Sequence, residues 1–207
     1  IDMLVVGLTG RACSGKNVVA DLFVKETGWT SIDFDKLGWP VLEESHEELK
    51  ALFGPGCITP EGTVDHRMVR EAVYHDPALR KELEAITHPK IVAMCHLLTR
   101  QALQRGERAV IWNAPLLQRV HLDEECDAVV FVEASPEVRF SRAVKRDGMS
   151  RAQFEARERN QNDVDPATVS PKTRLFTIDN NGGDEWSLHR QVVECCAKIA
   201  EIRKDRQ

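Results

Sequence analysis

The chain has 207 residues, enough for one sizeable core, and its 28 basic and 33 acidic residues leave a net charge of −5. An acidic chain argues against nucleic acid as the main partner, because nucleic-acid-binding domains are usually basic. No apolar run approaches the ~20 residues of a membrane span, and the 6 cysteines lack the C-x-x-C pairs of a zinc site, so we expect a cytoplasmic protein with reduced thiols that does not contact a membrane.

The first predicted element is a buried strand, residues 3–6, followed by a glycine-rich turn and a helix. The turn contains Gly10 and, after four intervening residues, Gly15-Lys16. This is the P-loop spacing, in which backbone amides and a helix N-terminus surround a phosphate while the lysine reaches the outer phosphates. The predicted nucleotide phosphate site comprises Gly10, Arg11, Ala12, Cys13, Ser14, Gly15, Lys16, Asn17 and Val18.

The residue after the P-loop lysine departs from the usual pattern. This place normally holds Ser or Thr, whose hydroxyl binds Mg²⁺, and here it holds Asn17. An amide oxygen is also a hard, neutral ligand for Mg²⁺, but it lies on a longer arm. We therefore expect Asn17 to bind the metal from a different position or through water.

Two aspartates end the second predicted strand, residues 29–35. The carboxyl ends of parallel strands face the ligand crevice beside a P-loop. If the strand remains extended to its end, Asp33 and Asp35 project to the same face. We expect Asp33 to take part in the chemistry, whereas Asp35 is either a metal ligand or the N-cap of the next helix.

Helices dominate residues 37–106, which we expect to form an insertion where a second substrate docks. His88-Pro89 is expected to interrupt one of these helices, because proline removes a backbone donor and restricts the residue before it. His88 is then a packing residue or a functional one. Capping signals mark helix starts here and further along the chain: Ser45-x-x-Glu48, Asp65, Asp76, Ser135-Pro136 and Ser150-x-x-Gln153.

Three more apolar runs complete a predicted parallel sheet. They are residues 108–113, 127–133 and 175–178, and the second is nearly all apolar, which is typical of a strand buried on both faces. Residues 114–117 form the loop after the first run, and residues 179–183 a loop on the crevice side of the sheet. The final helix is expected to bury Val192, Cys196 and Ile199, which recur at helical spacing.

Arginines gather on the helix that follows the fourth strand. Arg139, Arg142 and Arg146 are spaced to share one face of it. Such a face is either solvated or, for Arg142 and Arg146, part of a lid that closes over phosphates, because a guanidinium binds phosphate through two parallel hydrogen bonds.

In their order and spacing, these motifs resemble the dephospho-coenzyme A kinase family, whose members use ATP to phosphorylate the ribose 3′-hydroxyl of dephospho-CoA. The matching pieces are residues 7–16, 32–35, 53–66, 88–89, 115–117, 142–150, 161 and 178–182. The resemblance implies an α/β P-loop kinase fold with a five-stranded parallel sheet flanked by helices. It also implies a nucleotide-binding core of residues 3–36, 107–135 and 174–207, a helical CoA-binding region of residues 37–106, and a lid of residues 136–173.

The resemblance further implies roles for individual residues. Lys16 would bind the ATP phosphates, Asp33 the acceptor hydroxyl, and Arg142 would act from the lid. The remaining nucleotide-binding residues would be Arg146 and Asn180, the latter near the adenine. The acceptor site would comprise Thr9, Asp33, His88, Pro115, Leu116 and Leu117, and the Mg²⁺ ligands would be Asn17 and Asp35. The implied partners are ATP and dephospho-CoA, bound by a monomer or weak homo-oligomer.

The chain departs from the family pattern around the phosphates. The family commonly has Asp in place of Asn113, Phe-Glu in place of Gln118-Arg119, and Gly in place of Arg11 and Ala12; residues 162–174 also form a longer stretch than usual. Because carboxylates and a hydroxyl are lost, a catalytically impaired protein that binds ATP or CoA stays open as an alternative. A kinase for another small molecule also stays open, because it would share the loop and the lid. A GTPase is disfavoured because the chain has no N-K-x-D motif.

Overall fold

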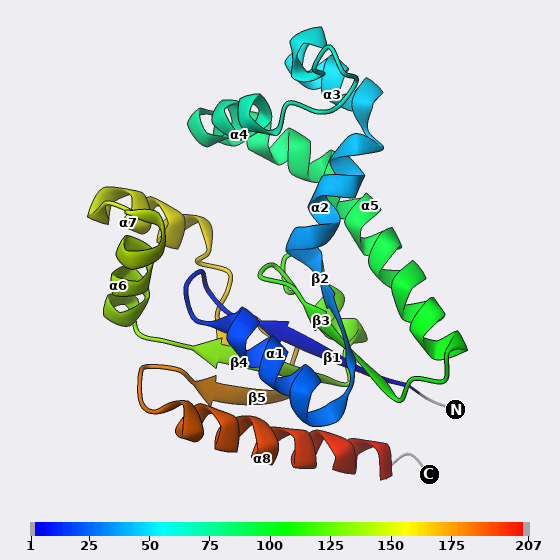
Figure 1. The fold of residues 1–207 in the computed structure, drawn as a ribbon, viewed down its shortest axis with the longest axis vertical. Helices are drawn as coiled ribbons and strands as arrows, with labels where there is room; N and C mark the ends of the chain where they lie inside the picture. Colours follow the sequence, from blue (N-terminus) through cyan, green and yellow to red (C-terminus); the bar gives the residue numbers. More distant parts are fainter. Residues whose placement is uncertain (1–2, 205–207) are drawn as a thin grey trace. The chain divides into compact units, whose positions relative to one another are not determined.

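The computed structural model describes residues 3–204, which form two compact units: residues 3–32 with 99–204, and residues 33–98. The strands are β1 (Leu4–Thr9), β2 (Thr30–Asp33), β3 (Ala109–Asn113), β4 (Ala128–Glu133) and β5 (Arg174–Asp179) (Figure 1). The first unit also contains α1 (Lys16–Thr27), η2 (Leu122–Glu125), α6 (Pro136–Asp147), α7 (Arg151–Asn160), η3 (Pro166–Thr168) and α8 (Glu185–Lys204). The second contains α2 (Phe34–Glu43), α3 (His46–Phe53), η1 (Pro55–Cys57), α4 (His66–His75) and most of α5 (Pro77–Gln104).

The strand order of the sheet is β2-β3-β1-β4-β5. Strand β1 pairs in parallel with β3 on one side and with β4 on the other, and β4 pairs in parallel with β5. The chain therefore leaves β1 for one half of the sheet and later returns to build the other half. Ligands bind at such a switch point, outside the carboxyl ends of the strands. The glycine-rich turn that follows β1 begins at this place, and the predicted five-stranded parallel sheet is confirmed.

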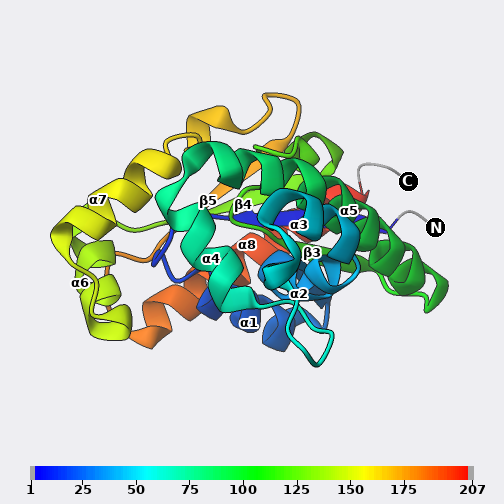
Figure 2. The same cartoon turned by 90° about the horizontal axis from the view of Figure 1, so that it is seen from above.

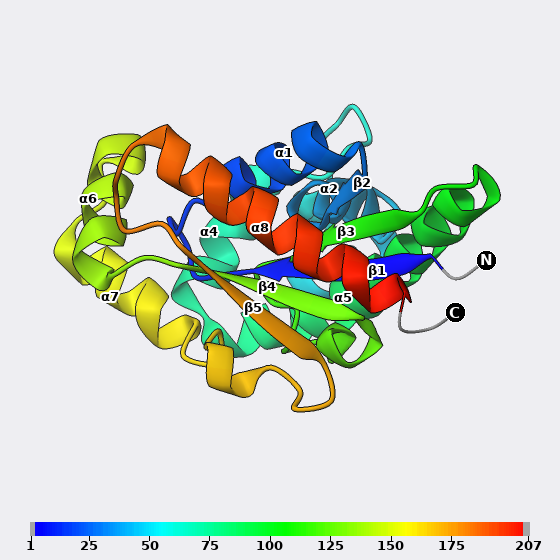
Figure 3. The ribbon, with the colours of Figure 1, turned by 90° about the horizontal axis from the view of Figure 1, so that it is seen from below.

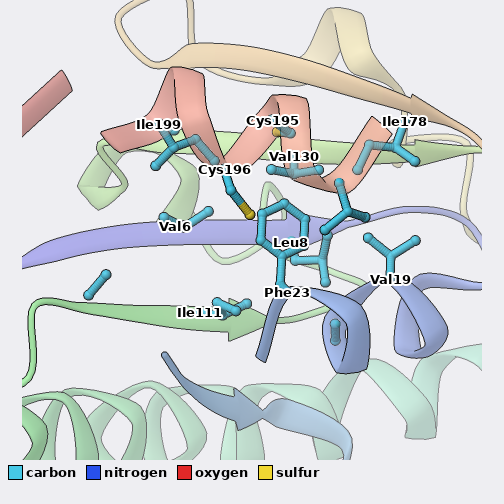
Figure 4. Packing of buried hydrophobic residues seen from close by; sticks show 14 of the residues in the cluster. Val6, Leu8, Val19, Phe23, Ile111, Val130, Ile178, Cys195, Cys196 and Ile199 are labelled. Carbon is cyan, nitrogen blue, oxygen red and sulfur yellow. The ribbon is translucent and has the colours of Figure 1, made fainter. Parts of the chain in front are cut away.

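One face of the sheet is covered by α1 and α8, which pack against each other as well as against the strands (Figure 3). Figure 4 shows Val6 and Leu8 of β1 in one apolar cluster with Phe23 of α1 and Ile199 of α8. Burial of each such side chain contributes roughly 1.5–3 kcal/mol. The predicted core positions of the last helix are confirmed: Val192, Cys196 and Ile199 are all buried.

Two adjacent cysteines of α8 belong to this core. Cys195 and Cys196 are both buried members of the apolar cluster, and Figure 4 shows the Cys196 sulfur directed from α8 toward Phe23. Burial raises the pKa of each thiol to about 12, because the thiolate form loses hydration in an apolar environment.

On β1, Gly7 leaves room for the opposite packing layer. A Cβ atom at this position would lie 2.5 Å from Leu117 Cδ2 and 2.9 Å from Cys126 Sγ. Gly7→Ala is therefore expected to lower the free energy of unfolding by about 1–3 kcal/mol, the usual cost of overpacking, measured by urea denaturation. In a Leu117→Ala background the same change should cost clearly less. An equal cost in both backgrounds would contradict the assignment of the strain to this contact.

In the second unit, two local predictions are wrong. Ser45 does not form a capping box, because its hydroxyl donates to Val41 O of the preceding helix (2.6 Å) and accepts from Lys90 Nζ (2.8 Å). His88-Pro89 does not interrupt a helix either: α5 continues through both residues. Pro89 removes a single backbone donor from the interior of this 28-residue helix, and the helix continues despite that loss. Despite that length, none of the helices described is long and apolar enough to cross a membrane.

The other capping predictions are confirmed. Asp65 accepts from Met68 N, Asp76 from Ala78 N and Leu79 N, and Ser135 from Val138 N. Ser150 and Gln153 form the predicted capping box at the start of α7. Helices α6 and α7 then pair side by side (Figures 1 and 2), and Arg151 lies over the Phe140 ring, with its Cζ 3.8 Å from the ring centroid.

Candidate functional site

The P-loop joins the carboxyl end of β1 to α1 with the conformation that a phosphate cradle needs. Gly15 occupies the N-cap position with φ of 89°, a left-handed value that glycine adopts without steric cost. Helix α1 begins at Lys16, so the amides of its first turn have no partner inside the helix. Gly15 has no side chain that could cap this end. The positive end of the helix dipole and these amides together favour an anion.

The tip of the loop is tight. Ser14 N donates to Arg11 O at 3.1 Å, and Cys13 has φ of 63°. A Cβ atom on Gly10 would lie 2.6 Å from Val132 O and 2.8 Å from Ser14 Oγ, so this position requires glycine. The Ser14 hydroxyl is buried and has no hydrogen-bond partner among the described residues. An orphaned buried hydroxyl is costly, which is consistent with a site that also accommodates a polar ligand.

Lys16, Asn17 and Asn113 form a hydrogen-bonded group beside the loop. The Lys16 ammonium donates to the side-chain oxygen of Asn113 and, at 3.4 Å, to Asn17 Oδ1. Asn113 Nδ2 donates to Asn17 Oδ1 at 3.1 Å. Asn113 ends β3, the neighbour of β1, so the parallel sheet brings it to the same edge. Lys16 is 9% exposed, and these contacts place its ammonium against two neutral amide oxygens.

Arg142 and Asn180 bind the outer, carbonyl side of the loop. Arg142 Nη1 donates to Cys13 O and Ser14 O, both at 3.2 Å, and Nη2 donates to Asn180 O at 2.7 Å. The Asn180 side chain in turn donates to Ser14 O at 2.7 Å. Because the C=O and N–H of a trans peptide point in opposite directions, the Gly15 amide is directed away from these two side chains, toward the other side of the loop.

Arg146 and Val18 stay at the surface of this unit. Arg146 forms two hydrogen bonds to the neighbouring Asp147, at 2.9 and 2.7 Å, and the Arg146 side chain is 63% exposed. Val18 is 52% exposed in the first turn of α1. A nucleotide-binding role for Arg146 remains a prediction. In this structure its side chain lies on a solvated helix face, as the other alternative expected.

The predicted acceptor segment after β3 lies partly in the interior. Thr9 is fully buried, and its hydroxyl donates to Pro115 O at 3.3 Å. Leu117 is also buried, whereas Pro115 and Leu116 are half-buried. Thr9 and Leu117 therefore fix the loop in place, and only Pro115 and Leu116 offer surface to a substrate as the loop stands.

Asp33 and Asp35 do not form the predicted extended pair. Helix α2 begins at Phe34, and Asp33 is its N-cap, with Oδ1 accepting from Asp35 N at 3.0 Å. Both the shared-face prediction and the alternative that Asp35 is the cap are therefore wrong. The reason is that the Asp33 side chain satisfies a free helix amide as soon as the strand ends. The second Asp33 oxygen, Oδ2, lies 3.9 Å from Lys36 Nζ, and Asp35 is an exposed residue of the first helical turn.

His88 lies within α5 and is half-buried. Like Asp33 and Asp35, it belongs to the second unit, whereas the P-loop belongs to the first. The substrate and metal roles of these residues remain predictions.

Asn17 is the residue of the group beside the loop that could serve as a metal ligand. Within residues 3–204, no group of three or more His, Cys, Asp or Glu is placed to hold a metal. Asn17 Oδ1 is a neutral oxygen directed toward Lys16 Nζ, in the P-loop position that usually supplies one metal ligand. This fits Mg²⁺, which keeps several waters and binds nucleotide phosphates together with one or two protein oxygens.

Arg119, which stands where the resemblance leads one to expect a carboxylate, has a structural role. It binds Asp163 through two hydrogen bonds, at 2.7 and 2.8 Å, and donates to Asn160 O at 2.7 Å. The hydrogen bonds and charge of Arg119 lower the pKa of Asp163. This pair anchors the long stretch that follows α7.

Three contacts of the site were not expected from the motifs: the Asn113 oxygen on Lys16, and Glu158 and Gln161 near the first half of the loop. The signal for Asn113 was its place at the end of a strand adjacent to β1. Glu158 gave no signal, because helical spacing alone cannot reveal a partner far along the chain.

Comparison with known proteins gives one consistent result. The family model described as dephospho-CoA kinase matches residues 4–183. A protein named dephospho-CoA kinase from Deinococcus radiodurans is 38% identical over 181 residues, which cover 86% of this chain and 84% of the relative. A solved protein from Thermus thermophilus superposes with a TM-score of 0.76 at 28% identity, covering 96% and 98% of the two chains. A dephospho-CoA kinase from Campylobacter jejuni has the same fold, with a TM-score of 0.69 at 23% identity over 95% and 97% of the chains.

Proposed function

This chain belongs to the dephospho-CoA kinase family, and on that premise we propose that it transfers the γ-phosphoryl group of ATP to the 3′-hydroxyl of the dephospho-CoA ribose. The observation that supports this most directly is the P-loop itself, with Lys16 beside the loop and Arg142 bound to its outer carbonyls. In the reaction, the acceptor oxygen forms a bond to the γ-phosphorus while the bond to the β,γ-bridging oxygen breaks. The products are coenzyme A and ADP.

Phosphoryl transfer gains mostly from positioning and from charge neutralisation. The amides at the start of α1 and the Lys16 ammonium would hold the phosphates. Arg142 would place a second cation next to the loop, since its guanidinium already lies against Cys13 O and Ser14 O. Asp33 would orient the acceptor hydroxyl and take up its proton, using the oxygen that does not cap α2.

We further propose that Asn17 and Asp35 contribute ligands to a magnesium ion that arrives with ATP. When bound, the ion would neutralise phosphate charge and orient the outer phosphates. Asn17 supplies the neutral oxygen described above, and Asp35 would supply a carboxylate or bind through water. Because the usual hydroxyl and carboxylate ligands are replaced, we expect Mg²⁺ binding to depend more on the ATP phosphates than on protein side chains.

The assay is ATP-dependent phosphorylation of dephospho-CoA, with ADP release and coenzyme A formation both measured, in Mg²⁺ and in Mn²⁺. Turnover with dephospho-CoA, and much less with nucleoside monophosphates, gluconate or shikimate, is the expected result. Tight binding of ATP and dephospho-CoA without turnover would support a binding protein instead. Turnover with another acceptor only would identify a different small-molecule kinase.

The need for an Arg142 guanidinium that donates through two nitrogens can be tested without removing the positive charge. Arg142→Lys is expected to lower kcat about 10–100-fold, the effect of losing one or two charge-assisted hydrogen bonds, because an ammonium cannot reach Cys13 O and Asn180 O together. Steady-state kinetics at saturating substrates measure it. Arg151→Lys is the matched control, since Arg151 is exposed and pairs with Glu137. Equal activity of the two variants would remove Arg142 from the mechanism.

A further inference from the structure

The segment at the end of α7 binds the first half of the P-loop through hydrogen bonds and an ion pair. We call residues 158–164 the clamp segment. Glu158 Oε2 accepts from Arg11 Nη1 at 3.1 Å, and Val164 O accepts from Arg11 Nε at 2.9 Å. Gln161 Oε1 accepts from the Ala12 amide at 2.8 Å. All of these residues belong to the same compact unit, so the clamp segment fixes two successive loop residues from a position 147 or more places later in the chain.

Glu158 also binds a second arginine, which comes from α6. Arg139 donates to both Glu158 oxygens, with Nη2 at 2.6 Å from Oε2, and Arg139 Nε donates to Ala134 O at 2.9 Å. The Arg139 side chain is 3% exposed and that of Glu158 is 18% exposed. Burial by itself would raise the pKa of Glu158, but the hydrogen bonds and charges of Arg139 and Arg11 lower it, so the carboxylate is charged at neutral pH. One anion therefore joins two cations, one on the P-loop and one on α6.

The same helix carries Arg142, three residues after Arg139 and so on the same side of α6. Whether the Arg142 guanidinium reaches Cys13 O and Ser14 O depends on where α6 lies relative to the loop. The Glu158 contacts with Arg139 and Arg11 set that relation directly. A partly buried ion pair is a poor source of net stability but a strict constraint on geometry, which favours a role in alignment.

We propose that Glu158 is a positioning residue for phosphoryl transfer, which holds Arg139 and Arg11 together and thereby keeps Arg142 of α6 aligned on the phosphate loop. This inference rests on the proposed kinase function for its rate measurement. A binding measurement with ATP tests it independently of the acceptor.

The test is a double-mutant cycle between Glu158 and Arg142. Glu158→Gln keeps the size and one acceptor oxygen but removes the charge. We expect it to lower kcat about 10-fold or more and to weaken ATP binding, as for loss of a charged hydrogen bond, with KM for dephospho-CoA within about 2-fold of the original value. In an Arg142→Ala background the same change should have little further effect, because residues that act as one unit are non-additive.

Glu155→Gln is the matched control, since Glu155 lies on the same helix and is exposed. Thermal unfolding of every variant shows whether it is folded at the assay temperature. If Glu158→Gln does not fold, Arg11→Gln replaces it in the cycle, because the Arg11 side chain is 28% exposed and its loss leaves the Arg139 pair intact. Full additivity with Arg142→Ala, or unchanged kcat and ATP affinity in a folded Glu158→Gln variant, would overturn the proposal. Absence of dephospho-CoA turnover in the unmodified protein would instead count against the proposed function, and the cycle would then be read from ATP dissociation constants.

Discussion

Replacing Lys16 with methionine is expected to lower kcat with ATP and dephospho-CoA by about 10²–10³-fold, the range seen when one preorganised donor to developing charge is removed. Methionine keeps much of the length of the side chain, so the buried position stays filled. The loss should appear mainly in kcat, because charge on the transferred group is greatest in the transition state.

A structural cost of this change must be separated from the catalytic one. The Lys16 ammonium donates to Asn17 Oδ1 and to Asn113, and its loss leaves the Asn113 oxygen without that donor. Urea denaturation should therefore show a modest loss of stability, on the order of 1–3 kcal/mol. Lys25→Met, at an exposed position of the same helix, should leave both kcat and stability near their original values. Retention of more than a tenth of the activity by a folded Lys16→Met variant would be incompatible with the proposed role.

Asp33→Asn should lower kcat by about 10²–10⁴-fold, the usual contribution of a positioned general base. Asparagine keeps the side-chain oxygen that accepts from the Asp35 amide and is as good an N-cap as aspartate, so the start of α2 should be preserved.

Another N-cap of the same unit provides the control. Asp76 accepts from Ala78 N and Leu79 N at the start of α5, and Asp76→Asn should leave kcat unchanged. If Asp33→Asn turns over dephospho-CoA at the original rate under saturating conditions, Asp33 is only a cap, and another group must take the proton.

Most of the first unit could be predicted from sequence because the features that specify it are local. Its strands are short apolar runs, which are typical of a buried parallel sheet. The apolar runs gave the strands within one to three residues, and the spacing of Gly10, Gly15 and Lys16 gave the phosphate loop at the correct edge. The helix starts at Ser135 and Ser150 followed from hydrogen bonds that span only three residues.

The errors arose where two local rules competed for the same residue. At Asp33, a strand pattern and a capping preference both applied, and the cap ended the strand two residues early. At Ser45, the hydroxyl donates to a carbonyl of the preceding helix instead of capping the next one. At Pro89, the long helix outweighed the loss of one donor. The Glu158 contacts could not be predicted because they join residues far apart in the chain, and no spacing rule connects them.

The placement of the cysteines leads to a simple way of observing the loop. Alkylating reagents are attacked by thiolates and not by protonated thiols, and with pKa values of about 12 the buried pair on α8 stays protonated and shielded at neutral pH. The other three cysteines outside the loop are buried as well, whereas Cys13 is partly exposed at the tip of the loop. Alkylation of the native protein should therefore concentrate on Cys13, and slower labelling in the presence of nucleotide would report occupancy of the phosphate cradle without any engineered probe.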